Sequence, residues 1–302
     1  MFLISAVLYY TYQVSNSKLA ITETKSTSLD KIYVLNLDRS VDRYKKMKEK
    51  LDALNLSTDY TRFSAVDGKK IKLVNIETKE VITGEEAFNN TKLLQGEFNI
   101  ICSDEYSGDF NPVKLNLTSF HPRTIGEIGA ACSHKKIWQE IVTKGYKNTL
   151  ILEDDANFIA GFKKRLDNVM NNLPLDYEFV YLFAINIGDS YSIKNKDKIL
   201  QTILRITDKK RENKFVKQAR RNITSAVGYI VTQEGAQKLL DGFKNYYRVD
   251  KNIIELIENN KLIAYVTKPL LLDACLAQNK ECETTIGTFP SHGRLSSDIV
   301  GK

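Results

Sequence analysis

The chain has 302 residues, of which 44 are basic, 37 are acidic and 42% are hydrophobic, and its net charge is +7. This composition excludes a mainly disordered protein, because a chain of this length has enough apolar side chains to bury a sizeable core. The counts of fifteen glycines, five prolines and four cysteines exclude collagen-like, repeat and disulfide-scaffold proteins. The cysteines form no CxxC pair, so a structural zinc site is not expected, and they fit a reducing compartment in which the fold does not need disulfides.

Residues 1–29 are expected to lie outside the folded domain. Residues 2–17 are uncharged and begin with an apolar run, but they are fewer than the roughly 20 apolar residues that a membrane-spanning helix needs. No basic residue precedes them, as one would in a signal peptide. The segment is either an interfacial or unstructured leader or a weak signal anchor, and a polar linker at 22–28 follows it.

The next segment alternates between strand and helix patterns. Residues 31–37 have the pattern of a buried strand, residues 41–54 place apolar side chains at spacings of three and four, and residues 60–66 have the pattern of a second strand. This alternation predicts an α/β fold with a mainly parallel sheet flanked by helices, and ligands at the carboxyl ends of its strands.

Residues 69–122 show little strand or helix periodicity, so we expect an irregular insertion there with one helix near 85–94. This insertion would act as a lid or specificity loop. A helix is then predicted over 124–145, opened by a capping box formed by Thr124 and Glu127. The remaining expected elements are helices at 158–173, 234–243 and 249–258 and strands at 148–152, 179–183, 226–231 and 262–266, with a polar tail at 275–302.

The positive charge is concentrated in one segment. Residues 198–221 contain nine basic residues and two acidic ones, a local charge of +7 that equals the net charge of the whole chain. The segment is either a solvated face or a surface for an anionic lipid or a diphosphate. No nucleic acid partner is expected, because the sequence has no RNP pattern, zinc finger or basic region followed by heptads.

The strand at 148–152 ends in three consecutive acids, Glu153, Asp154 and Asp155. Clustered carboxylates repel one another unless a cation meets them, and Mg²⁺ or Mn²⁺ binds through one or two such groups together with phosphate oxygens. Alternatively, Asp154 or Asp155 caps the following helix. The sequence has no Walker loop, GxSxG elbow, GxGxxG fingerprint or HExxH pair, which leaves chemistry on a diphosphate that a metal holds.

Four blocks in this order resemble glycosyltransferase family 25, the lipooligosaccharide and collagen galactosyltransferase type. The blocks are VLNLDRSVDR at 34–43, GEIG at 126–129 with the following Ser133, His134 and Trp138, LILEDD at 150–155, and GYIVTQEGAQKLL at 228–240. The resemblance covers residues 31–272 apart from the insertion and the basic segment. It therefore implies one domain over 30–274.

The resemblance implies a GT-A-like domain, which is a single Rossmann-like domain that binds a nucleotide sugar. It also implies a UDP-sugar donor, an inverting transfer, and Mn²⁺ or Mg²⁺ held by Asp155 and Asp154. The residues expected near the donor are Asn36, Arg39, Arg43, Glu153, Asp154 and His134. Two alternatives stay open: Arg39 forms a surface ion pair with Asp38 or Asp42, and His134 is a hydrogen-bonded polar residue near the core.

An inverting transfer needs a base that takes the proton of the acceptor hydroxyl. The expected catalytic residue is Asp250, in a late block that resembles the family, and Glu127 is the second candidate. The sequence departs from the family pattern at Arg248, where proline is usual, and at Val227, where a histidine is usual.

The expected activity is the metal-dependent transfer of a hexose, galactose above all, from a UDP-sugar to a hydroxyl of a glycan, glycolipid or protein. The alternatives are a non-catalytic binding module of the same fold and an anionic-surface binder that uses residues 198–221. We expect a cytoplasmic protein, with peripheral membrane association through the N-terminal segment and entry into a secretory lumen as open alternatives.

Overall fold

The computed structural model describes residues 28–102, 113–114, 122–186, 213–220, 223–243 and 248–274. The expected leader, the polar tail and the larger part of the basic segment lie outside these residues. None of the helices described is both long and apolar enough to cross a membrane.

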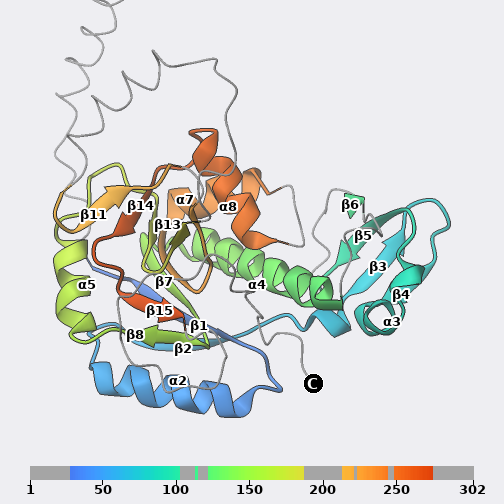
Figure 1. The fold of residues 1–302 in the computed structure, drawn as a ribbon, viewed down its shortest axis with the longest axis horizontal. Coiled ribbons are helices and arrows are strands. Elements are labelled where there is room, and N and C mark those ends of the chain that lie inside the picture. The colour runs from blue at the N-terminus through green and yellow to red at the C-terminus, as the bar shows by residue number, and fades with distance from the viewer. Residues whose placement is uncertain are drawn as a thin grey trace, which may run out of the picture.

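A mixed sheet of seven strands forms the centre of the domain (Figure 1). The strand order is β11-β14-β9-β13-β7-β1-β2, and all strands run in one direction except β13 and β11. The bounds of these strands are β1 Lys31–Asn36, β2 Tyr60–Ser64, β7 Asn148–Glu153, β9 Phe179–Tyr181, β11 Val216–Gln218, β13 Gly228–Thr232 and β14 Ala264–Thr267.

Helices cover both faces of this sheet (Figure 1). On one face α2 and α5 bury side chains such as Met47 and Phe162 against Ile32 of β1. On the other face α4, α7 and α8 form a second core with side chains such as Trp138 and Ile151. The bounds of these helices are α2 Val41–Leu54, α4 Pro122–Lys144, α5 Phe162–Met170, α7 Gln233–Asp241 and α8 Val249–Glu258. The α/β fold with a mainly parallel sheet flanked by helices is confirmed.

Most predicted elements are present with bounds that differ by a few residues, and the starts of two helices differ for a clear physical reason. α4 begins at Pro122, so Thr124 lies inside its first turn and does not cap the helix; proline is common at the first helical position, where its missing N–H has no intrahelical partner. The helix expected over 158–173 begins only at Phe162, because the short strand β8 (Ala156–Phe158) and a left-handed Gly161 (φ 70°) come before it. β8 pairs with β15 (Leu272–Ala274) and another short strand pair joins β10 (Ile185–Asn186) to β12 (Ile223–Thr224).

The stretch from 69 to 122, expected to be irregular, contains a second sheet with the strand order β4-β3-β5-β6. Along its strands, buried side chains alternate with exposed ones. The buried apolar side chains, among them Leu73, Phe98 and Ile100, form one face of this sheet, and this face packs into the same core as α4. Its elements are β3 Lys72–Asn75, β4 Val81–Thr83, α3 Gly84–Asn89, β5 Glu97–Ile101 and β6 Val113–Lys114, with 3-10 turns at Gly68–Lys70 and Thr91–Leu93. Figure 1 shows this small sheet at one end of α4, away from the central sheet.

Two features attach the small sheet to α4. The Cα atoms of the disulfide-bonded Cys102 and Cys132 are 5.8 Å apart, which joins the residue after β5 to the middle of the helix. Backbone segments also meet closely at glycines: a Cβ on Gly68 would overlap the carbonyl of Ile125 in α4, and a Cβ on Gly84 at the start of α3 would overlap the carbonyl of Gly68. The position of the small sheet is therefore set by close backbone contact and a covalent bond.

Candidate active site

A pocket lies where β1 and β7 end. Their parallel register places Leu35 beside Glu153, so the next residues of both strands, Asn36 and Asp154, emerge together at the carboxyl edge of the sheet. The pocket is lined by Leu35, Asn36, Leu37, Ser40, Arg43, Ala65, Val66, Ala130, Ser133, Glu153, Asp154 and Asp155. Four of the predicted site regions thus meet here: the end of β1, the start of α2, the three acids and the first half of α4.

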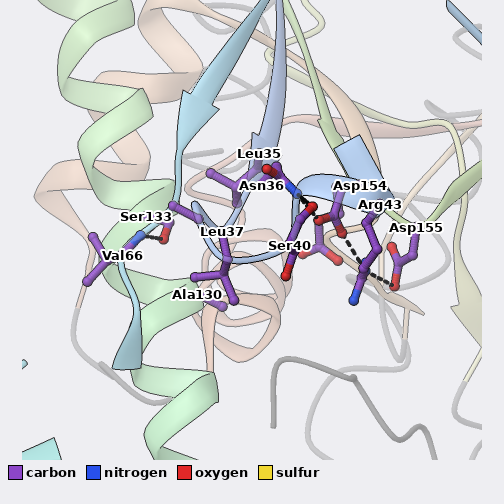
Figure 2. A pocket seen from close by; sticks show the side chains of 12 residues that line it. Leu35, Asn36, Leu37, Ser40, Arg43, Val66, Ala130, Ser133, Asp154 and Asp155 are labelled. Carbon is purple, nitrogen blue, oxygen red and sulfur yellow. Dashed lines mark hydrogen bonds and ion pairs between the residues drawn. The ribbon is translucent and has the colours of Figure 1, made fainter. Parts of the chain in front are cut away.

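Asn36 and Arg43 hold Asp154 from two directions (Figure 2). The buried Asn36 donates from Nδ2 to Asp154 Oδ2 at 2.6 Å and to the carbonyl of Ser40 at 3.0 Å, and its Oδ1 accepts from Arg62 Nε at 2.9 Å. Arg43 forms an ion pair with the other oxygen of Asp154 and lies 3.5 Å from Asp155 Oδ2. Asn36 therefore fixes a carboxylate, and Arg43 is the cation nearest the two aspartates in the lining of the pocket.

Asp155 has an oxygen without a partner. Its Oδ1 is buried and accepts no hydrogen bond within the described residues, although the side chain as a whole is 40% exposed. Burial raises the pKa of Asp155 from its ordinary value of 3.8 to about 7, and the charges of Glu153 and Asp154 add to this, while Arg43 opposes it. Burial also raises the pKa of Asp154, against the effects of Arg43 and Asn36. Within the lining of the pocket, Arg43 is the one cation that faces the carboxylates of Glu153, Asp154 and Asp155.

The alternative that Asp154 or Asp155 caps the following helix is wrong. β8 follows them directly, and the residue that precedes α5 is Gly161. No group of three or more His, Cys, Asp or Glu side chains in the described residues is arranged to hold a metal ion. The orphaned Oδ1 beside a second carboxylate nevertheless fits a divalent cation of the magnesium type, which is bound by one or two carboxylates plus substrate phosphates.

The wall contributed by α4 contains residues that the sequence analysis did not assign to the site. Ser133 Oγ accepts a hydrogen bond from the backbone N–H of Val66 at 2.8 Å and donates to the carbonyl of Gly129 at 2.7 Å. This contact holds the segment after β2 against the helix. Gly129 permits it because it has no Cβ to push Val66 away. The small residues of the second block were the sequence signal for a close helix contact.

His134 lies behind the pocket wall and is fully buried. Its Nδ1 is 2.7 Å from the hydroxyl of Tyr229 and its Nε2 is 3.3 Å from Oε1 of Glu153. The alternative that His134 is a hydrogen-bonded polar residue near the core is therefore the arrangement found, and the histidine reaches the pocket only through Glu153.

Besides His134, three further predicted residues lie outside the lining of the pocket. Arg39 forms an ion pair with Asp67 on the segment after β2. Glu127 is half-buried on α4, one turn before Ala130. Asp250, in the first turn of α8, accepts a 2.6 Å hydrogen bond from Thr224 Oγ1 and lies 3.2 Å from a guanidinium nitrogen of Arg248.

The fold and the pocket define an α/β domain with a ligand pocket at the carboxyl ends of its parallel strands. Residues 29–253 match the family model described as glycosyltransferase family 25 (LPS biosynthesis protein). The chain belongs to glycosyltransferase family 25, and the resemblance inferred from the four sequence blocks is confirmed.

Curated relatives agree with this assignment. Procollagen galactosyltransferase 1 of Danio rerio is 25% identical over 250 residues, which cover 81% of this chain and 34% of the relative. Procollagen galactosyltransferase 2 of Homo sapiens is 25% identical over 260 residues, which cover 80% of this chain and 34% of the relative. A probable inactive glycosyltransferase 25 family member 3 of Bos taurus is 30% identical over 156 residues, which cover 51% of this chain and 21% of the relative. This chain spans about a third of the length of the first two.

Proposed function

We propose that this protein transfers a hexose, galactose above all, from a UDP-sugar to a hydroxyl group, and that the pocket between β1, β7 and α4 binds the diphosphate of the donor. The acceptor would be a glycan, a glycolipid or a hydroxylated protein side chain. The observation that carries the proposal is the buried, unpartnered Oδ1 of Asp155 beside Asp154 at the strand ends, in a chain of this family.

A divalent cation, Mn²⁺ or Mg²⁺, would be held by Asp155 and Asp154 and would neutralise the charge that develops on the departing UDP. The residues of the chain have distinct parts in this proposal. Asn36 orients Asp154 through its 2.6 Å hydrogen bond, and Arg43 can exchange its ion pairs with the aspartates for contacts with phosphate oxygens. The apolar side chains of Leu35, Val66 and Ala130 in the lining would limit water beside the reacting bond.

The base that takes the acceptor proton stays a prediction. Asp250 and Glu127 both lie outside the described lining, so either would act only on an acceptor that reaches beyond the pocket. Asp250 stays the first candidate because it lies in the late block that resembles the family.

The proposal is tested by thermal unfolding of the chain with UDP, UDP-galactose, UDP-glucose and UDP-N-acetylglucosamine, each with and without Mn²⁺. A ligand that binds only the folded state stabilises it in proportion to the logarithm of its concentration over its dissociation constant. We expect a shift with UDP that needs Mn²⁺, and no such shift for Asp155→Ala. Hydrolysis of one of the UDP-sugars without acceptor would identify the donor.

Lys48→Ala is the matched control, because Lys48 is exposed on the outer face of α2 and pairs with Asp52 away from the pocket. It should bind UDP as the wild type does. Manganese-dependent binding that survives Asp155→Ala would contradict the metal assignment.

The second candidate function is a non-catalytic member of the family, which the name of the relative from Bos taurus brings to attention. In that case Arg43 would be the permanent cation of the two aspartates, and no nucleotide would shift the unfolding temperature. A shift with UDP and Mn²⁺ but without turnover of any donor would support a binding module that retains the site.

A further inference from the structure

Four polar side chains form a row that leads from the core on the α4 face of the sheet to the pocket. Trp138 Nε1 donates to the hydroxyl of Tyr229 at 2.9 Å, and that hydroxyl is 2.7 Å from His134 Nδ1. His134 Nε2 in turn is 3.3 Å from Oε1 of Glu153. The three rings are fully buried, whereas the Glu153 side chain is 20% exposed and lines the pocket.

The hydrogen bonds of this row fix their own direction. The indole N–H of Trp138 can only donate, so the Tyr229 oxygen is its acceptor and the hydroxyl proton must find another partner. The partner that the structure provides within the described residues is His134 Nδ1, which accepts that proton only if Nδ1 is unprotonated. The histidine then carries its proton on Nε2, where it faces the carboxylate oxygen of Glu153.

The other neutral tautomer fails at two places. A proton on Nδ1 would leave the buried Tyr229 hydroxyl accepting two bonds with no acceptor for its own proton, and burying an unpaired polar group is costly. It would also point the lone pair of Nε2 at a carboxylate oxygen 3.3 Å away. One tautomer therefore satisfies every group in the row.

We propose that His134 is a positioning residue that aims Glu153. Its Nε2–H, set by Tyr229 and Trp138, donates to Glu153 and draws this carboxylate toward α4, away from Asp154 and Asp155. The two aspartates are then left to face the cation and the diphosphate, so the inference rests on the proposed function. Side chains that hydrogen-bond outside the ligands of a metal site typically change metal affinity by 10- to 100-fold when they are removed.

The hydrogen bonds of this row can be removed while the packing of its rings is kept. Tyr229→Phe removes only the hydroxyl, because the ring still stacks on Phe179, with the ring centroids 4.6 Å apart. Tyr177→Phe is the matched control: Tyr177 is also buried, and its hydroxyl donates to Asn148 Oδ1 at 2.5 Å, at the opposite end of β7. His134→Gln keeps a side chain that can donate to Glu153, and His134→Leu does not.

The first measurement is the nitrogen chemical shifts of the histidines in the protein without ligand. The chain has three histidines, so the signal lost in His134→Gln identifies His134. We expect the Nε2–H tautomer in the wild type and a mixture of tautomers in Tyr229→Phe. An Nδ1–H tautomer or an imidazolium in the wild type would overturn the proposal, whether or not the protein binds a nucleotide.

The second measurement is the affinity for Mn²⁺ in the presence of UDP, by calorimetry. We expect a 10- to 100-fold loss in Tyr229→Phe and His134→Leu, partial recovery in His134→Gln and wild-type affinity in Tyr177→Phe. Wild-type affinity in Tyr229→Phe and His134→Leu would overturn the positioning role. If the wild type binds no UDP with Mn²⁺, the proposed function fails, and the role of His134 at a metal site fails with it even if the tautomer is as expected.

Discussion

Asp155 combines a buried, unpartnered oxygen with a side chain that still reaches solvent. Its environment favours the protonated form, because burial and the neighbouring acids Glu153 and Asp154 outweigh Arg43. A residue that stabilises the domain would not be expected to have this arrangement. We attribute it to function, since active sites hold titratable groups in environments that shift their pKa values.

The pH dependence of stability should report this residue. The pKa of Asp155 is about 7 in the folded chain and near 3.8 when unfolded, so the folded state binds more protons between these values. Asp155 therefore contributes most to the free energy of unfolding at low pH. This contribution is lost as the pH rises from about 4 to about 7.

Asp155→Asn should remove this component. Urea unfolding of both proteins without divalent ions, at pH 5, 6, 7 and 8, should show the wild type losing stability relative to the variant as the pH rises. Saturating Mn²⁺ with UDP should reverse this trend, because the cation favours the ionised carboxylate. Parallel curves in the absence of metal would contradict the raised pKa.

At the level of elements, the contact between α4 and the segment after β2 shapes one wall of the pocket. Gly129 brings the helix against the backbone at Val66 and Gly68, and Ser133 then hydrogen-bonds to the Val66 N–H. Helix propensity alone would favour alanine at position 129 by roughly 1 kcal/mol. The close packing around Gly129 predicts instead that alanine at this position lowers the stability of the folded protein.

Gly129→Ala should lower the free energy of unfolding by about 1–3 kcal/mol, because its Cβ would lie 2.7 Å from both the Val66 oxygen and the Gly68 nitrogen. The measurement is urea unfolding monitored by circular dichroism. Gln139→Ala, a partly exposed position of the same helix, should change stability by no more than about 0.5 kcal/mol. A more stable Gly129→Ala variant would show that the segment moves away without loss.

At the scale of the whole molecule, a disulfide joins the small sheet to the central body. Cys102 and Cys132 are 30 residues apart in sequence and both are buried. Disulfides persist mainly in oxidising compartments. The cytoplasmic location stays a prediction, and this pairing favours the alternative of a secretory or otherwise oxidising environment.

Replacing both cysteines by alanine should lower the free energy of unfolding by about 2–4 kcal/mol, chiefly because the unfolded chain loses its cross-link. Urea unfolding of the wild type with and without reductant isolates the bond itself, since both forms keep the sulfur atoms. Equal midpoints for the oxidised and reduced wild type would mean that the cross-link does not stabilise the domain.

The family, the α/β order of the elements and the acidic strand end could all be predicted from the amino-acid sequence. These are local properties: strand and helix periodicities lie within single segments, and the bounds of α2 and α8 agree with those predicted. The place of the pocket could also be anticipated, because the carboxyl ends of parallel strands, here at Asn36 and Glu153, lie at one edge of a sheet.

Contacts between segments that are distant in the sequence could not be predicted, because they depend on how the elements pack in the fold. The pairing of Cys102 with Cys132, the small sheet within 69–122 and the row from Trp138 to Glu153 all join residues whose sequence neighbours give no sign of the contact. His134 looked equally suited to a ligand or to the core, because exposure and hydrogen-bond partners depend on how α4 packs on the sheet. Its burial against Tyr229 assigned it to the core, with one nitrogen directed at the site.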